Sequence, residues 1–323
     1  MSNASENSTR SLSEAPVVAV VERSGFIESV HRGVVVAVDA DGSVLLERGD
    51  ASAPSFPRSS NKPLQALAMV RAGLDLRDDL LALAAASHSG ESFHLDGVRR
   101  ILAGAGLTEA DLQNTPDLPY DEQAKREWLA ADGVPTSIAQ NCSGKHAAML
   151  ATCVVNGWDT ATYRDPAHPL QVAMAQTLAE LCDEPVAATG VDGCGAPVMA
   201  VSPRGLALAF GRLAAAADGP QQRVADAIRA YPEFLGGTRR DVTDLIRGLP
   251  GVIAKDGAEA FYAVGLPDGR GVAVKISDGT QRARPVVLAD ALRRIGVDAE
   301  VLDRLAASPV LGHGEPVGSV RAV

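Results

Sequence analysis

The fold of this chain is decided by a stretch that reads Ala260-Phe261-Tyr262-Ala263-Val264, a Pro267-Asp268-Gly269 turn, and Gly271-Val272-Ala273-Val274-Lys275-Ile276. Two β-rich runs on either side of a glycine-containing turn predict a β-hairpin. Apolar residues over 287–295 then recur at helical spacing, so a helix is expected directly after the hairpin.

The beginning of the chain carries the same kind of pattern. Short β-rich runs occupy residues 17–21, 33–38 and 44–47, and Asp41-Gly42 between the last two is a hairpin signal. Residues 62–217 are instead helical in pattern. Strands at both ends of the chain around a largely helical middle predict one α+β domain over residues 16–323, with an antiparallel sheet made from both termini. Residues 1–15 are polar and are expected to form a disordered tail.

Charge and hydropathy limit the function. The net charge is −10 and no run of Lys or Arg exceeds two residues, which argues against nucleic acid or a membrane surface as a partner. No stretch of eighteen apolar residues occurs, and the first fifteen residues lack an apolar segment, so neither a membrane span nor a signal peptide is expected. These features predict a cytoplasmic protein that acts on a small soluble substrate.

Lysine is rare in this chain, with five lysines beside 25 arginines. Arginine is always charged, so a position that needs an amine with an adjustable pKa has to be lysine. Only Lys125 lies in an ordinary polar setting. The other four stand in motifs of small residues and mark the places to look for chemistry: Lys62, Lys145, Lys255 and Lys275.

The first of these motifs is Ser59-x-x-Lys62, directly before Pro63 and a helical pattern. The spacing puts a hydroxyl and an amine on one face of a helix start. A neutral lysine there could take the serine proton, provided that burial or a second cation lowers the lysine pKa. A serine that simply caps the helix is the alternative.

Two further motifs carry hydroxyl and amine groups. Ser87-His88-Ser89-Gly90-Glu91 forms a polar turn after an apolar helical run, and Lys255-Asp256-Gly257 precedes a predicted strand. Read alone, each has an ordinary interpretation, as a surface loop and as a solvated charge.

The four cysteines fall into two classes. Cys153 and Cys182 lie in apolar helical patterns, where cysteine acts as a small buried hydrophobe. Cys142 and Cys194 lie in polar turns that contain glycine, and residues of these types suit zinc. Neither turn has Cys-x-x-Cys spacing, so a metal site, a catalytic thiol and plain turn residues all remain open.

Taken together and in order, five motifs resemble the L-asparaginase II family of the Rhizobium etli type, and the resemblance runs from about Val17 to the C-terminus. The motifs are Ser59-x-x-Lys62-Pro63-Leu64-Gln65, Ser87-His88-Ser89-Gly90-Glu91, Asn141-Cys142-Ser143-Gly144-Lys145-His146, Val191-Asp192-Gly193-Cys194-Gly195 and Ala254-Lys255-Asp256-Gly257.

The resemblance implies a fold similar to the serine β-lactamases and glutaminases, with two Ser-Lys pairs in the active site. It pairs Ser59 with Lys62 and Ser87 with Lys255, while Lys275 competes with Lys255 for the second lysine position. It also implies a zinc site and substrate-binding acids. The zinc ligands would be Cys142, Lys145 and Cys194, and the candidate substrate-binding residues are Asp192 and Glu91.

The activity implied by the resemblance is hydrolysis of L-asparagine to L-aspartate and ammonia through an acyl-enzyme, in a homodimer. Which serine forms the covalent bond stays open. Two other classes of function compete: a glutaminase or penicillin-recognising serine acylase, and a non-catalytic protein that binds zinc or an amino acid.

Overall fold

The computed structural model describes residues 3–323, in which one large antiparallel sheet draws strands from both ends of the chain. The strands of this sheet are β1 (Val17–Arg23), β2 (Phe26–Val38), β3 (Val44–Arg48), β6 (Ile253–Asp256), β7 (Phe261–Gly265), β8 (Gly271–Ile276), β9 (Pro309–Gly312) and β10 (Glu315–Ala322). They follow the order β6-β7-β8-β2-β1-β10-β9, and β3 pairs with β2. The predicted α+β class, with a sheet from both termini, is confirmed.

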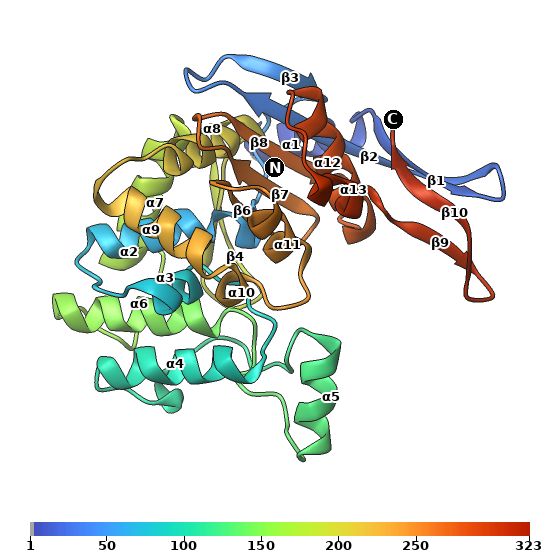
Figure 1. Cartoon of the computed structure of the whole chain (residues 1–323). Coiled ribbons are helices and arrows are strands. Elements are labelled where there is room, and N and C mark those ends of the chain that lie inside the picture. The colour runs from blue at the N-terminus through green and yellow to red at the C-terminus, as the bar shows by residue number, and fades with distance from the viewer. Residues whose placement is uncertain (1–2) are drawn as a thin grey trace.

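β2 links two different halves of this sheet. Its first half pairs with β1 and is mostly exposed, whereas its second half pairs with β3 and β8 and is buried. Gly33 lies at the change, where a Cβ atom would be 2.6 Å from Lys275 O, so the backbones approach too closely for a side chain. In Figure 1 the exposed half projects away from the helices, together with β9 and β10.

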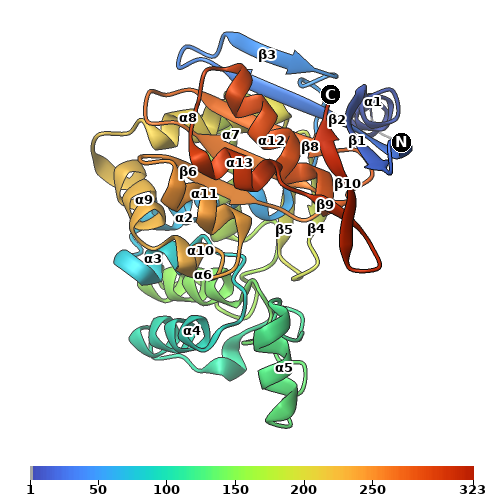
Figure 2. The same ribbon diagram turned by 45° about the vertical axis from the view of Figure 1, so that its right-hand side comes forward.

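Helices cover both faces of the buried half. α8 (Pro203–Ala214) packs against β2, β7 and β8. α12 (Arg284–Arg294) contacts the same three strands and also packs against α13 (Glu300–Ala306). Every residue of β8 is buried, as expected for a strand that is covered on both sides (Figure 2). The helix expected over 287–295 is confirmed as α12, which begins three residues earlier because Pro285 suits a first helical turn.

The remaining helices form a body beside the sheet, and α4 and α5 lie at its far end in both Figure 1 and Figure 2. The helices of this body are α2 (Lys62–Arg71), α3 (Asp78–Ala84), α4 (Ser92–Gly104), α5 (Glu122–Ala130), α6 (Ser143–Asn156), α7 (Pro169–Cys182), α9 (Gly219–Ala230), α10 (Pro232–Leu235) and α11 (Asp241–Gly248). Residues 3–323 also contain three short 3-10 helices: η1 (Arg58–Asn61), η2 (Glu109–Asp111) and η3 (Gln281–Ala283).

Residues 62–217, which have a mostly helical pattern, also contain a β-hairpin. β4 (Ala188–Val191) and β5 (Pro197–Ala200) form a separate two-stranded sheet, and their connection carries Asp192 and Cys194. The turn is fixed by hydrogen bonds from Asp192 N to Ala196 O (2.9 Å) and from Gly195 N to Asp192 O (2.8 Å). A candidate thiol and a candidate acid therefore stand on a rigid tip.

The prediction that residues 1–15 form a disordered tail is wrong for most of that range. Residues 3–13 form α1 (Asn3–Ser13), whose Ser11 side chain is buried and donates a hydrogen bond to Asp50 O (3.1 Å). The prediction rested on the lack of an apolar run, whereas the helix docks through small residues and a backbone acceptor. Residues 1 and 2 of that prediction lie outside the described residues.

Over residues 3–323, no helix has both the length and the apolar character needed to cross a membrane.

Candidate active site

The turn that carries Ser59 and Lys62 is built by close backbone contacts. Ser59 lies in η1, which leads directly into α2, and the backbone N–H of Lys62 donates to Ser59 O. The end of β6 approaches this turn so closely that a Cβ on Gly257 would lie 2.7 Å from both Pro57 O and Ser60 Oγ. The Lys255-Asp256-Gly257 motif and the Ser-x-x-Lys motif therefore lie against each other.

The amine of Lys62 joins three of the sequence motifs. The side chain is buried, and Nζ donates to Ala86 O (2.7 Å), Ser87 Oγ (2.9 Å) and Cys142 Sγ (3.1 Å). Each of the three N–H bonds of a protonated amine thus has an acceptor. Ser87 therefore contacts Lys62, and not Lys255 as the resemblance implied, while Ser59 Oγ makes no hydrogen bond with the described residues.

Lys255 is the amine with the adjustable pKa. Its side chain is completely buried at the end of β6, and Nζ donates to Asp256 O (2.7 Å) and Asp256 Oδ1 (2.6 Å). Burial lowers the pKa of Lys255 to about 8, with the charges of Lys62 and Arg240 acting in the same direction and that of Asp256 opposing them. Lys255 therefore changes its charge close to neutral pH.

The competing lysine lies elsewhere on the sheet. Lys275, in β8, donates to Glu259 O, and burial also lowers its pKa. Neither Lys62 nor Lys255 contributes to that shift. Position and electrostatics both favour Lys255 as the second lysine of the site.

Asp256 is held ionised by two arginines that sequence analysis did not single out. Its carboxylate pairs with Arg240 Nη2 and lies 3.7 Å from Arg284 Nη1. Burial alone would raise the pKa of Asp256, but these two guanidinium groups and Lys255 hold it well below the usual range. No local pattern identifies Arg240 or Arg284, because each is one of 25 arginines and meets Asp256 only through the fold.

The two turn cysteines come together, as the resemblance implied. A hydrogen bond with Cys194 is the main reason that the pKa of Cys142 is well below that of a free thiol, while the same contact raises the pKa of Cys194. The two sulfurs therefore share one proton. Lys145 Nζ donates to Cys194 Sγ (3.3 Å), and although burial alone would lower the pKa of Lys145, the charges of the sulfurs and Asp192 raise it.

The donor set fits zinc in chemical type, since it offers two sulfurs and one amine that a metal ion would deprotonate on binding. Over residues 3–323, no group of three or more His, Cys, Asp or Glu side chains is arranged to hold a metal ion. A site here would depend on Lys145 as the third ligand.

The two candidate substrate-binding acids have different environments. Asp192 Oδ1 accepts from Arg58 Nε (2.7 Å), and Lys145 and Arg58 lower its pKa although burial alone would raise it. Glu91 instead accepts from Thr238 N (2.9 Å) and Thr238 Oγ1 (2.6 Å) and caps α4. Asp192 thus faces the thiols as an ionised carboxylate, whereas both oxygens of Glu91 already serve the scaffold.

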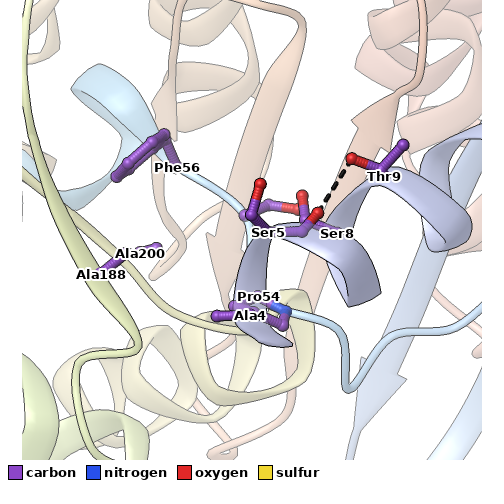
Figure 3. Close-up of a pocket in the computed structure, with 9 residues that line it drawn as sticks. Ala4, Ser5, Ser8, Thr9, Pro54, Phe56, Ala188 and Ala200 are labelled. Carbon is purple, nitrogen blue, oxygen red and sulfur yellow. Dashed lines mark hydrogen bonds between the residues drawn. The ribbon is translucent and has the colours of Figure 1, made fainter. Parts of the chain in front are cut away.

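Two cavities lie near these motifs. One of about 380 Å³ is lined by Tyr120 and by Asn141, the residue before Cys142, with Asp117, Leu118, Pro119, Glu122 and Lys125. The other, of about 290 Å³, lies between α1 and the segment that leads to Ser59; Figure 3 shows Phe56 facing Ser5 and Ser8 across it. Among the described residues that line this second cavity, none is ionisable, so acid-base chemistry does not belong there.

Comparison with solved structures finds likeness in fold at low identity. Mglu in its native form is 15% identical, with a TM-score of 0.44, over 82% of this chain and 65% of that chain. This chain therefore spans about two thirds of the length of that protein. A covalent complex between the Bacillus subtilis glutaminase YbgJ and 5-oxo-L-norleucine is 13% identical, with a TM-score of 0.39, over 90% of this chain and 94% of that chain.

No curated protein matches the chain. A family model does: that of L-asparaginase II matches residues 19–322, nearly the whole sequence. The match covers all five motifs, and the chain therefore belongs to the L-asparaginase II family.

Proposed function

We propose that this protein is an amidohydrolase that converts L-asparagine and water to L-aspartate and ammonia. Membership of the L-asparaginase II family supports the reaction class. The observation that carries the proposal is the buried contact between Lys62 Nζ and Ser87 Oγ (2.9 Å), beside a second buried amine, Lys255, with a pKa of about 8. A hydroxyl and an amine at this distance, with a second amine able to lose its proton, are what activation of a serine requires.

In the proposed reaction, Ser59 Oγ attacks the side-chain amide carbon and its proton passes, through the Ser87 hydroxyl, to the neutral Lys255 amine. This transfer requires Ser87 Oγ, which contacts Lys62 in the structure, to come within hydrogen-bond reach of Lys255. The tetrahedral intermediate collapses as the carbon–nitrogen bond breaks, and the proton held by Lys255 leaves with ammonia. Water then attacks the ester, and its proton returns along the same groups to Ser59. The positive charge of Lys62 stabilises the developing oxyanions.

We further propose that zinc binds at Cys142, Lys145 and Cys194. When bound, it would supply a fixed positive charge that polarises or attracts the substrate's carboxylate. Asp192, ionised and paired with Arg58, would bind the substrate's α-ammonium group. Because that carboxylate keeps one oxygen free of Arg58, it can accept a hydrogen bond from an ammonium ion.

Ammonia release from asparagine and from glutamine, measured in parallel on the purified protein, tests the proposed function. We expect turnover of asparagine to exceed that of glutamine. Faster release from glutamine would make the protein a glutaminase, and hydrolysis of nitrocefin without ammonia release would make it a penicillin-recognising acylase. Tight binding of asparagine without turnover would leave only a binding protein.

The zinc proposal predicts that Cys142→Ala and Cys194→Ala each reduce bound zinc to less than one tenth of the wild-type content. Loss of one of three ligands and of the substrate-facing charge should raise KM for asparagine about tenfold or more. Elemental analysis after dialysis and steady-state kinetics measure the two effects.

The matched control for these variants is Cys153→Ala, because Cys153 is also buried but lies in the apolar interior of α6, where burial raises its pKa to about 11. Its zinc content and KM should equal those of the wild type. Wild-type protein without zinc but with normal KM would contradict the proposed metal site.

A homodimer, as the resemblance implies, remains a proposal. Light scattering coupled to size-exclusion chromatography tests it, with a mass of 33.4 kDa for the monomer. An elution mass at that value across the micromolar range would contradict the dimer.

A further inference from the structure

Arg240 connects the two catalytic motifs that the sequence keeps far apart. It lies immediately before α11, and its side chain is only 13% exposed. Nη1 donates to Ser87 O (3.2 Å), and Nη2 donates to Asp256 Oδ2. One guanidinium group therefore bridges the turn that carries Ser87 and the strand that carries Lys255.

The contacts on both sides of Arg240 make this bridge continuous. On one side, Ser87 Oγ accepts from Lys62 Nζ (2.9 Å). On the other side, the second oxygen of Asp256 accepts from Lys255 Nζ (2.6 Å). The distance between the serine hydroxyl and the Lys255 amine thus depends on a chain of short contacts that passes through Arg240.

We propose that Arg240 is a positioning residue, which sets the Ser87 hydroxyl and the Lys255 amine relative to each other for proton transfer. The proposal rests on the proposed amide hydrolysis. Arg240 acts through Asp256 and the Ser87 backbone and does not itself contact the reacting groups. Its planar fork suits this role, because two N–H groups at fixed angles reach two acceptors on different elements.

Tyr120 holds the guanidinium group from a third direction. Arg240 Cζ lies 4.7 Å from the centre of the Tyr120 ring, within the range of a cation–π contact. Tyr120 is 52% exposed and lines the 380 Å³ cavity together with Asn141, the neighbour of Cys142. Arg240 is therefore fixed between a buried carboxylate, a backbone carbonyl and an aromatic face, which leaves it little freedom to move.

The charge of Arg240 also reaches Lys255. The charged or titratable groups that face this amine are Asp256 beside it on β6, Lys62 on α2 and Arg240, with Arg284, Asp241 and Tyr262 beyond Asp256. Arg240 and Lys62 lower the pKa of Lys255 and Asp256 raises it. Removal of the Arg240 charge should therefore raise the pKa of Lys255.

The test compares Arg240→Gln and Arg240→Lys with the matched control Arg239→Gln. Arg239 is the neighbouring arginine, 53% exposed and paired with Asp121 at the surface. We expect Arg240→Gln to lower kcat about 10- to 100-fold with KM within about threefold, as for a misplaced catalytic group. Its pH–kcat/KM profile should shift to higher pH. Arg240→Lys keeps the charge but cannot bridge both acceptors, so its kcat falls while its profile stays in place.

A second measurement does not depend on turnover. Five lysines give few resonances in a protein labelled with ¹³Cε-lysine, and the Lys255 signal can be assigned with Lys255→Arg. Its titration should move to higher pH in Arg240→Gln and stay unchanged in Arg239→Gln.

The outcomes separate this proposal from the proposed function. Wild-type protein that releases no ammonia from asparagine contradicts the function, and the lysine titration still reports on Arg240. Normal kcat in Arg240→Gln, or an unchanged Lys255 titration in that variant, overturns the positioning role. A loss of kcat that is matched in Arg239→Gln does the same.

Discussion

Replacement of Lys255 by methionine is expected to lower kcat/KM for asparagine by on the order of 10³-fold, the range of general acid-base catalysis. Lys255 Nζ has two hydrogen bonds, both to Asp256, so one direction of the amine stays without a partner among the described residues. All three directions of Lys62 Nζ are already taken. Lys255 is therefore the amine that has room to take a proton.

The pH profile gives this prediction a second readout. With a pKa of about 8, Lys255 is mostly charged at pH 7 and mostly neutral above pH 9. Only the neutral amine has the lone pair that accepts a proton, so wild-type kcat/KM should rise with pH through about 8. The residual activity of Lys255→Met should lack this rise. A variant that keeps it would remove Lys255 from the mechanism.

Stability should respond in a defined direction. The folded chain lowers the pKa of Lys255 from 10.5 to about 8, so the unfolded chain binds more protons between these values. This group therefore makes the free energy of unfolding increase with pH from about 8 to 10.5. Lys255→Met should lose that increase and be at least as stable as the wild type at pH 7, because Asp256 keeps Arg240 and Arg284 as partners. Urea unfolding of the wild type and of Lys255→Met at pH 7, at about pH 8 and at about pH 10.5 measures the free energy of unfolding for both comparisons.

Lys275→Met is the matched control for Lys255→Met. Lys275 is also a buried strand lysine with a pKa lowered by burial, but its amine donates to Glu259 O and not to a group of the Ser-Lys motifs. Its kcat/KM should stay within about threefold of the wild type. Equal losses in the two variants would mean that any buried lysine of the sheet is needed for folding, and the assignment to Lys255 would fail.

The architecture could be predicted from the sequence because it rests on local patterns. Alternation and turn residues identified the hairpin of β7 and β8. The hairpin of β4 and β5 was missed, since its two four-residue strands are short and lie between strong helical patterns.

The candidate site was only partly predictable, because its motifs name side chains and not their partners. Composition and resemblance named Ser59, Lys62, Ser87, Lys255 and the two turn cysteines as candidates, and their roles stay predictions. The contact between Lys62 and Ser87 joins positions 25 residues apart, and that between Arg240 and Ser87 joins positions 153 residues apart. Spacing along the chain carries no information about such contacts, so the pairing of lysines with serines required the fold.

Substitution of Ser59 by alanine is expected to abolish formation of the covalent intermediate and to lower kcat by more than about 10³-fold. Ser59 Oγ has no hydrogen-bond partner among the described residues, and it stands in η1, which leads into the N-terminal end of α2, where the helix dipole favours a developing alkoxide. Ser87 Oγ instead accepts from Lys62, which suits a hydroxyl that relays a proton.

The two serines can be separated by trapping, with the diazoketone analogue of asparagine as the probe and peptide mass spectrometry as the readout. In wild-type protein we expect the adduct on Ser59. Ser87→Ala should still form that adduct, but more slowly, because the nucleophile remains and only the proton relay is lost.

Ser60→Ala is the matched control. Its hydroxyl is buried without a hydrogen-bond partner among the described residues and faces Gly257, so its loss should leave kcat unchanged. An adduct on Ser87 that persists in Ser59→Ala would reverse the two roles, and Lys62 would then contact the nucleophile itself.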